Sequence, residues 1–414
     1  MLHMKTDFWK LRSSEAIYIL SSRVFIAVMT LHLLSMDSIW FSSAFLFTYF
    51  MIRSLAGILL SHRLETFPKK HLLMLLTGLF LFIVLASILS AAVLGFSGKF
   101  VFPVAVGIGF VDSFYASVVN AFIPDVVEKE EIDDAFRKTF LMQASIDLFG
   151  IALGMTGYTL LGLTTIFWII LAGACIALVI QKIILHEGRA SVVNSLDSKS
   201  SIVKSLSLFL HYRFEPWWAL SSLIINLFLV PFSSFMIPYV IVKVSAQSPM
   251  FIGLIEGCAA LGAIASSFFI QKKAEHLIGK SGVVILSFFT LSLAFLMLSL
   301  SINVIVWSVL ASLMGMAIVM NNVSVEACRS VAIPEEHRVK IQTIHNCIIG
   351  LGNPFGLLIV PYIVSKYSYS TALLFSCLSV FVVAIFVRFI PLFNVLLAND
   401  SDVSNLYKHT YGDQ

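Results

Sequence analysis

Charged side chains are rare inside the long apolar stretches of this sequence, and the few that occur there could do chemistry. They are Arg23, Arg53, Asp112, Asp147 and Glu256, with His345 near the end of such a stretch. A charge at the centre of a membrane-spanning helix costs about 2.5–3.5 kcal/mol, so it needs a partner, a water-filled cavity or a function. A carboxylate in that setting has a raised pKa and can bind a proton near neutral pH. These residues therefore predict ion pairing or proton binding in an apolar environment.

Helical spacing puts two of the carboxylates on faces of small or polar residues. Asp112 shares its face with Asn120, and Asp147 lies on a stripe with Gly150 and Gly154. Such a face can line a cavity or pack closely against another helix, and close packing is the first interpretation for the glycines. For Asp112, a carboxylate satisfied by a neighbouring helix is the alternative to proton binding.

Depth along the helices indicates which charges meet. Asp147, Arg23 and Arg53 each lie about 10–12 Å from the same end of their stretches, so we predict that Asp147 pairs with Arg23 or Arg53. Glu256 is the only carboxylate well inside an apolar stretch of the second half, where it either binds a proton or reaches toward the interface. His345 can titrate near neutral pH, but a hydrated interfacial position is also typical of a histidine so close to a helix end.

The composition requires helices that cross a membrane to position these groups. Of the 414 residues, 59% are hydrophobic and 12% are charged, whereas an average soluble domain carries about 25% charged residues. This excludes an ordinary soluble enzyme, and apolar windows of about 20 residues predict an all-α membrane protein with twelve transmembrane helices. The predicted spans are 16–36, 38–60, 72–96, 101–123, 139–161, 164–185, 217–241, 249–271, 281–301, 303–325, 341–362 and 370–393.

The loop charges indicate orientation and domain limits. Of the 27 Lys and Arg residues, 20 fall in tails and loops on one side, and only Lys99, Lys243 and Lys366 fall on the other. Cytoplasmic segments retain positive charge, so both termini are predicted to be cytoplasmic. The predicted domains are a cytosolic tail (1–15), a six-helix bundle (16–185), a cytoplasmic linker (186–216), a second six-helix bundle (217–393) and a cytosolic tail (394–414). The second part of the linker is either a short interfacial helix or a plain connection.

Repeated motifs indicate two duplicated halves. Gly57 and Ser61 at the end of the second span correspond to Gly262 and Ser266 in the last part of the eighth. The chain resembles the major facilitator superfamily, and within it the branch that includes enterobactin exporters and macrolide efflux proteins. The branch resemblance is carried by the run from Asn120 through Pro124 to Ala135, the stretch from Ile237 to Ala263, and the loop from Ala327 to Lys340.

The resemblance implies the major facilitator fold and secondary active transport. We expect a proton-coupled exporter, an antiporter, of a small amphipathic compound such as a drug, a siderophore or a peptide-like antibiotic, working by alternating access. A nutrient importer (symporter) of the same fold and a lipid flippase remain open. The sequence has no nucleotide phosphate loop, no metal-type cysteine spacing and no hydrolase motif. We therefore expect no enzymatic activity, no cofactor, no metal and no nucleic-acid partner.

The candidate site residues follow from these expectations. Asp112 and Glu256 are expected to couple proton movement to substrate movement. Further proton-coupling or substrate-cavity candidates are Asp147, Arg23, Arg53, His345, Asn120 and Asn353, and the gating or hinge candidates are Gly57, Arg63, Pro124, Gly150, Gly154, Gly352 and Pro354. The Asn353-Pro354 pair is expected to break or kink its span. The protein is expected to be a monomer in the bacterial cytoplasmic membrane, with its substrate, protons and the lipid bilayer as partners.

Overall fold

The computed structural model describes residues 2–36, 39–64, 68–94, 98–127, 132–184, 206–398 and 406–411, and its regular elements in these ranges are all helical. The elements are α1 (Leu2–Ser35), α2 (Ile39–Leu64), α3 (Lys69–Leu94), α4 (Gly98–Val126), α5 (Ile132–Ile183), α7 (Phe214–Pro231), η2 (Phe232–Met236), α8 (Ile237–Tyr239), η3 (Val240–Val244), α9 (Met250–Ala265), η4 (Ser266–Ile270), α10 (Gln271–Leu300), α11 (Val304–Ala332), α12 (Glu335–Lys366), α13 (Tyr369–Phe386), η5 (Val387–Phe389), α14 (Phe393–Leu396) and α15 (Leu406–Tyr411). Each predicted span overlaps one of these helices. The predicted all-α fold with twelve transmembrane helices is therefore confirmed.

Two of the long helices contain a break at a glycine. The backbone of α5 has φ 76° and ψ 169° at Gly162, and that of α10 has φ 72° and ψ 162° at Gly279. Glycine adopts positive φ easily because it has no Cβ atom. Gly162 separates the predicted spans 139–161 and 164–185, and Gly279 directly precedes the predicted span 281–301. Each break therefore marks the end of one membrane crossing or the start of the next.

The helix that begins at Phe214 changes its winding near two prolines. α7 ends at Pro231, and the π-helical turns η2 and η3 lie on both sides of α8, which contains Pro238. Proline lacks the backbone N–H that would donate to the preceding turn. A wider π turn at such a point accommodates the interrupted hydrogen-bond ladder. The predicted span 217–241 is therefore one irregular helical run over Phe214–Val244.

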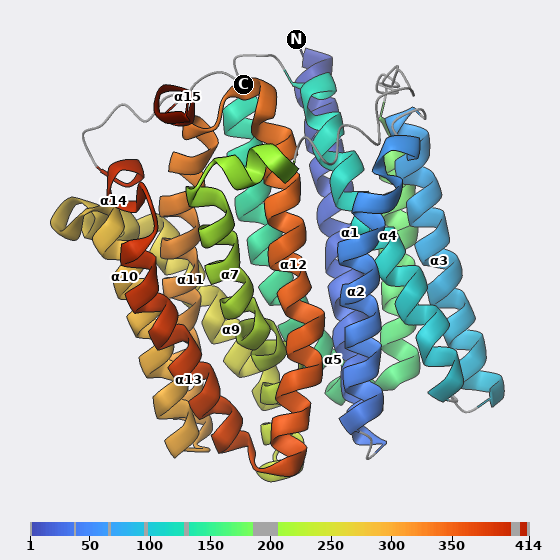
Figure 1. Ribbon diagram of the computed structural model, residues 1–414. Coiled ribbons are helices and arrows are strands. Elements are labelled where there is room, and N and C mark those ends of the chain that lie inside the picture. The colour runs from blue at the N-terminus through green and yellow to red at the C-terminus, as the bar shows by residue number, and fades with distance from the viewer. Residues whose placement is uncertain are drawn as a thin grey trace. The chain divides into compact units, whose positions relative to one another are not determined.

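The chain divides into two compact units. The first contains Met1–Ser195 and Ile237–Gly253, and the second contains Leu196–Met236 and Leu254–Gln414. In the first unit α1 packs on α5, α2 packs on α4, and α3 packs on both α4 and α5; in the second, α7 packs on α12, and α10 packs on α11 and α13 (Figure 1). Residues 237–253, which the sequence predicts in the second bundle, thus belong to the first unit by their contacts. The other predicted domain limits stay predictions.

Large apolar side chains cover the outside of these helices. Phe82, Phe268 and Leu300, for example, are 67%, 71% and 74% exposed. Eight helices in the described ranges are long and apolar enough to cross a membrane, and one of them, Met250–Leu300, is long enough for more than one crossing. Apolar surface of this extent is suited to lipid and would be unstable against water. The chain is therefore a multi-pass integral membrane protein.

Candidate functional site

The carboxylate of Asp112 on α4 is held by four side chains of neighbouring helices. Tyr18 and Ser22 of α1 donate hydrogen bonds to it at 2.8 and 2.9 Å, and Tyr49 of α2 donates one at 2.7 Å. Arg23 of α1 adds an ion pair, with 3.1 Å between its Nη1 atom and Oδ2 of Asp112. The Asp112 side chain is 5% exposed. Because donors and a cation surround the carboxylate, its negative charge is compensated inside the protein.

Helix periodicity and one close helix contact bring these groups together. Tyr18 and Ser22 are four residues apart on α1, so they project from the same face. α4 lies against α2 at Gly109, where a Cβ atom would come within 2.6 Å of the Tyr49 carbonyl oxygen. The small residue at position 109 therefore sets the separation between Asp112 and Tyr49.

Arg53 of α2 lies at the edge of the same group. Its Nη1 atom donates to the Tyr49 hydroxyl at 3.4 Å, and that hydroxyl accepts a shorter bond of 2.7 Å from Nη1 of Arg23. Tyr49 is fully buried, whereas Arg53 is partly exposed. We refer to Tyr18, Ser22, Arg23, Tyr49, Arg53 and Asp112 as the Asp112 cluster.

Glu256 of α9 has a very different environment. The residue is 2% exposed, and its Oε1 atom has no hydrogen-bond partner among the described residues. Burial alone thus does not distinguish Glu256 from Asp112, which is 6% exposed. What distinguishes them is the set of partners, since Asp112 has four and the described residues provide none for Oε1 of Glu256.

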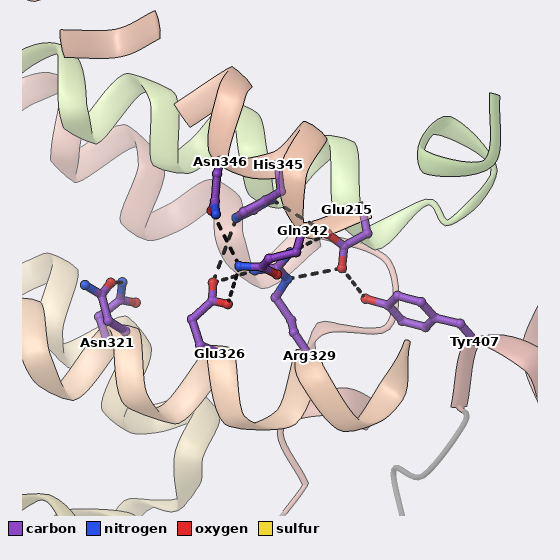
Figure 2. A network of polar contacts seen from close by, with 9 residues as sticks. Glu215, Asn321, Glu326, Arg329, Gln342, His345, Asn346 and Tyr407 are labelled. Carbon is purple, nitrogen blue, oxygen red and sulfur yellow. Dashed lines mark hydrogen bonds and ion pairs between the residues drawn. The ribbon is translucent and has the colours of Figure 1, made fainter. Parts of the chain in front are cut away.

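A second buried network joins α7, α11 and α15 in the second unit (Figure 2). Arg329 of α11 donates from Nε to Oε1 of Glu215 at 3.1 Å and from Nη2 to Oε2 at 2.7 Å, while its Nη1 is paired with Glu326. Tyr407 of α15 donates to Oε1 of Glu215 at 2.9 Å. Burial by itself lowers the pKa of Arg329, but the negative charges of Glu215 and Glu326 and the hydrogen bond to Glu215 raise it above the ordinary arginine value. The guanidinium therefore stays charged.

His345 of α12 borders this network without a hydrogen bond. Its Nδ1 atom is 3.7 Å from Oε2 of Glu215, and its Nε2 atom is 3.9 Å from Oε1 of Glu326. Neither ring nitrogen has a hydrogen-bond partner in the described part of the chain, and the residue is 0% exposed. The alternative of a hydrated interfacial histidine is therefore wrong. Gln342, one turn earlier on α12, donates to Oε2 of Glu326 at 3.2 Å.

The sequence does not reveal how deeply the charges near the helix ends are buried. Arg12 and Arg329 count as loop or tail charges in the sequence, but they are 2% and 0% exposed. Arg12 is paired with Glu15 at 2.6 Å, as Arg329 is paired with Glu326. In both pairs the opposite charges are three residues apart, and this spacing places them side by side on a helix. That spacing is the signal in the sequence that could have identified them.

Several predicted site residues lie outside the described part of the structure. This applies to Gly57 and to the side chains of Arg63, Asn120, Pro124 and Asp147. The predicted pairing of Asp147 with Arg23 or Arg53 therefore stays a prediction. Among the described residues, the ion-pair partner of Arg23 is Asp112.

Two predicted hinge glycines of α5 lie in tight contact with α1. A Cβ atom on Gly150 would come within 2.6 Å of Cβ of Arg23, and one on Gly154 within 2.8 Å of Cβ of Ala27. Real Cβ atoms do not approach other atoms so closely, so these positions exclude larger side chains. The contact fixes the position of Arg23 along the axis of α5.

The predicted hinge residues Gly352 and Pro354 lie inside the continuous helix α12. α12 runs through Pro354 without interruption, so a break at Asn353-Pro354 is not formed, and the alternative of a kink stays a prediction. The Oδ1 atom of Asn353 has no hydrogen-bond partner among the described residues. Gly352 lies against α7, where a Cβ atom would come within 2.6 Å of the Leu223 carbonyl oxygen. The structure thus places Gly352 in a helix contact.

Comparisons with known proteins agree with this architecture. Residues 223–400 match the family model described as Major Facilitator Superfamily. None of the curated proteins is significantly similar in sequence to this chain. Among the residues that the structure describes, no group of three or more His, Cys, Asp or Glu side chains is arranged to hold a metal ion.

Solved structures of transporters share the fold. A D-xylose-proton symporter has a TM-score of 0.74 at 14% identity, covering 93% of this chain and 98% of that one. The POT family transporter PepTSo has a TM-score of 0.71 at 12% identity, covering 95% and 99%. The nucleoside transporter NupG has a TM-score of 0.66 at 12% identity, covering 95% and 100%. The chain therefore has the twelve-helix fold of these transporters.

Proposed function

We propose that this protein is a secondary active transporter of the major facilitator superfamily that exports a small amphipathic compound in exchange for protons. The match of residues 223–400 to the superfamily model and the shared fold of three transporters support the superfamily. The motifs around Asn120 and Pro124 support the exporter branch named above. The proposal includes a bacterial cytoplasmic membrane with both termini in the cytoplasm, which the loop charges support.

The observation that carries proton coupling is the buried carboxyl of Glu256. An ionised carboxylate at 2% exposure, with one oxygen lacking any hydrogen bond in the described structure, loses its hydration without compensation. The effective penalty for burying an unpaired ion is several kcal/mol. Glu256 therefore carries a proton in this state, because the neutral acid avoids that penalty.

A carboxyl of this kind can couple two movements. Protonated, Glu256 is stable in its apolar surroundings; deprotonated, it stabilises a state in which water or a cation reaches it. Alternating access supplies two states with different exposure, so loss and gain of the proton drive the exchange between them. Hydrogen-bond donors and the Arg23 guanidinium surround the Asp112 carboxylate, and we assign Asp112 the task of holding Arg23. A direct role of Asp112 in coupling stays a prediction.

The test uses purified protein in lipid vesicles that contain a pH-sensitive dye. A panel of amphipathic acids, neutral compounds and amines is added in turn, and a transported compound is expected to move protons in the opposite direction. Glu256→Gln should abolish this proton movement and uphill transport, because the amide cannot release a proton. Counterflow of the same compound, which needs no net proton transfer, should continue.

Glu275→Gln is the matched control. Glu275 is a carboxylate of the same unit that accepts hydrogen bonds from Gln271 and Ser324, so its substitution should leave uphill transport near the wild-type rate. Undiminished proton movement in Glu256→Gln would reject the coupling role. Proton movement in the same direction as the compound would indicate import in place of export. Import is the second candidate function, and the fold shared with a D-xylose-proton symporter favours it.

A further inference from the structure

Arg53 has more hydrogen-bond donors than the described structure has partners for. A guanidinium carries five N–H donors and no acceptor. Among the described residues, the partner of Arg53 is the Tyr49 hydroxyl at 3.4 Å. That hydroxyl already accepts the shorter bond from Arg23 and donates to Asp112. Most donors of Arg53 are therefore available for another group.

The contact with Tyr49 shows where the Arg53 guanidinium points. Tyr49 is 0% exposed, and its hydroxyl lies among side chains of α1, α2 and α4. A nitrogen 3.4 Å from this hydroxyl faces the interior of the helix bundle, away from the apolar outer surface. Arg53 nevertheless remains partly exposed. Its free donors can therefore be reached by a compound that enters from outside the cluster.

The charges of the Asp112 cluster favour an anion at this position. Asp112 balances Arg23 at 3.1 Å, whereas no described carboxylate lies within ion-pair distance of Arg53. An arginine inside a spanning segment needs a compensating partner. The planar fork of a guanidinium matches the two oxygens of a carboxylate or phosphate group and binds them through paired hydrogen bonds.

We propose that Arg53 binds an oxyanion group of the transported compound, so that the substrate is an amphipathic anion with a carboxylate or phosphate group. The Tyr49 hydroxyl orients the Arg53 guanidinium, and Asp112 keeps Arg23 from competing for the anion. This inference rests on the proposed transport function and adds the substrate class to it.

The test measures binding to the detergent-purified protein by calorimetry, without any gradient. Two matched pairs of probes differ only in the anionic group: phenylacetyl-leucine with phenylacetyl-leucinamide, and phenyl phosphate with phenol. Hydrogen bonds to a charged group correspond to an affinity difference of about ten- to a hundredfold, so the wild type should prefer the anion of at least one pair by that factor. Arg53→Gln should abolish the preference.

Two further variants separate the role of Arg53 from effects of charge or folding. Arg53→Lys keeps the positive charge but loses the fork, so the preference should fall to an intermediate value. Arg388→Gln removes an exposed arginine of η5 and should keep the full preference.

A lipid phosphate could occupy the same donors of Arg53, so the titration is repeated in nanodiscs of phosphatidylcholine and of phosphatidylglycerol.

The outcomes are decisive in each direction. Equal binding of anion and neutral analogue in both pairs, or an unchanged preference in Arg53→Gln, would overturn the inference. If the preference for the anionic probe is lost only in phosphatidylglycerol nanodiscs, Arg53 binds a lipid headgroup, and the inference is overturned as well. Proton-coupled transport of a neutral or cationic compound would refute the substrate class alone, whereas an intact anion preference without uphill transport would refute the proposed function alone.

Discussion

Substituting Glu215 by glutamine should strongly destabilise the second unit, because it leaves Arg329 charged and buried without its main partner. The two side chains are each 0% exposed and joined by bonds of 3.1 and 2.7 Å. The glutamine keeps the size of the side chain but removes its charge and turns one acceptor oxygen into an NH₂ donor facing the guanidinium. The Tyr407 hydroxyl, 2.9 Å from Oε1, also loses its charged acceptor.

The magnitude follows from burial. Removing one partner of a buried ion pair costs about 3–5 kcal/mol, which for a unit of roughly 150–250 residues lowers Tm by about 6–20 °C. Glu326 stays paired with Arg329, but its side chain is 38% exposed, so water already compensates much of its charge. Glu326→Gln should therefore cost no more than about 1 kcal/mol. Tyr407→Phe, which removes one hydrogen bond to a charged group, should cost about 1.5–3 kcal/mol.

The assay is thermal unfolding of purified variants in one detergent. The expected order of Tm is wild type, then Glu326→Gln, then Tyr407→Phe, then Glu215→Gln. The double variant Glu215→Gln/Arg329→Gln should be less destabilised than the sum of its single variants, because no unpaired guanidinium remains. If Glu215→Gln has the Tm of the wild type, or if its Tm decreases only as much as that of Glu326→Gln, the reasoning from burial is refuted.

Three other predictions follow. Asp112→Asn should cost about 3–5 kcal/mol because it breaks the buried ion pair with Arg23 at 3.1 Å, and a wild-type yield and Tm would contradict this. Gly352→Leu should lower Tm by an amount that corresponds to about 1–3 kcal/mol, because α12 would collide with the backbone of α7; an unchanged Tm would show that the helices can separate freely. Reporter fusions at Lys99 should mark the outer face and those at Lys272 the cytoplasmic face, and a cytoplasmic signal at Lys99 would refute the topology.

The membrane crossings could be predicted from the sequence because bilayer thickness fixes their length. Apolar runs of about 20 residues are hard to mistake, and the predicted spans coincide with helices of the structure. The helix ends were less predictable. α1 begins at Leu2, well before the predicted start of its span at residue 16, because an existing helix gains a hydrogen bond with each added residue, whether polar or apolar. This extension buries Arg12 and Glu15 instead of leaving them in a solvated tail.

The pairing of charges could be predicted only in part. Position along a helix gives the depth of Arg23 and Asp147, and equal depth motivated their predicted pairing. Depth says nothing about which helices are neighbours or which faces meet, and these depend on close contacts such as that of Gly109 with the backbone of α2. For this reason Asp112, on α4, could not be identified from the sequence as a partner of Arg23.

Asp112 and Glu256 both lie inside apolar spans, so the sequence predicts the same role for the two carboxylates. Their different partners in the structure give a physical reason to assign them different roles. Protonation of Asp112 would weaken its ion pair with Arg23 and the hydrogen bonds from Tyr18 and Tyr49, so it would cost stability at several contacts at once. Protonation of Glu256 disrupts no hydrogen bond to Oε1 in the described structure and removes a buried charge. A proton should therefore bind to Glu256 without rearranging its neighbours, whereas its release requires a state with water or a cation beside the carboxylate. That dependence of proton release on conformation is what a proton-coupled transporter needs, and it is why we place the coupling proton on Glu256.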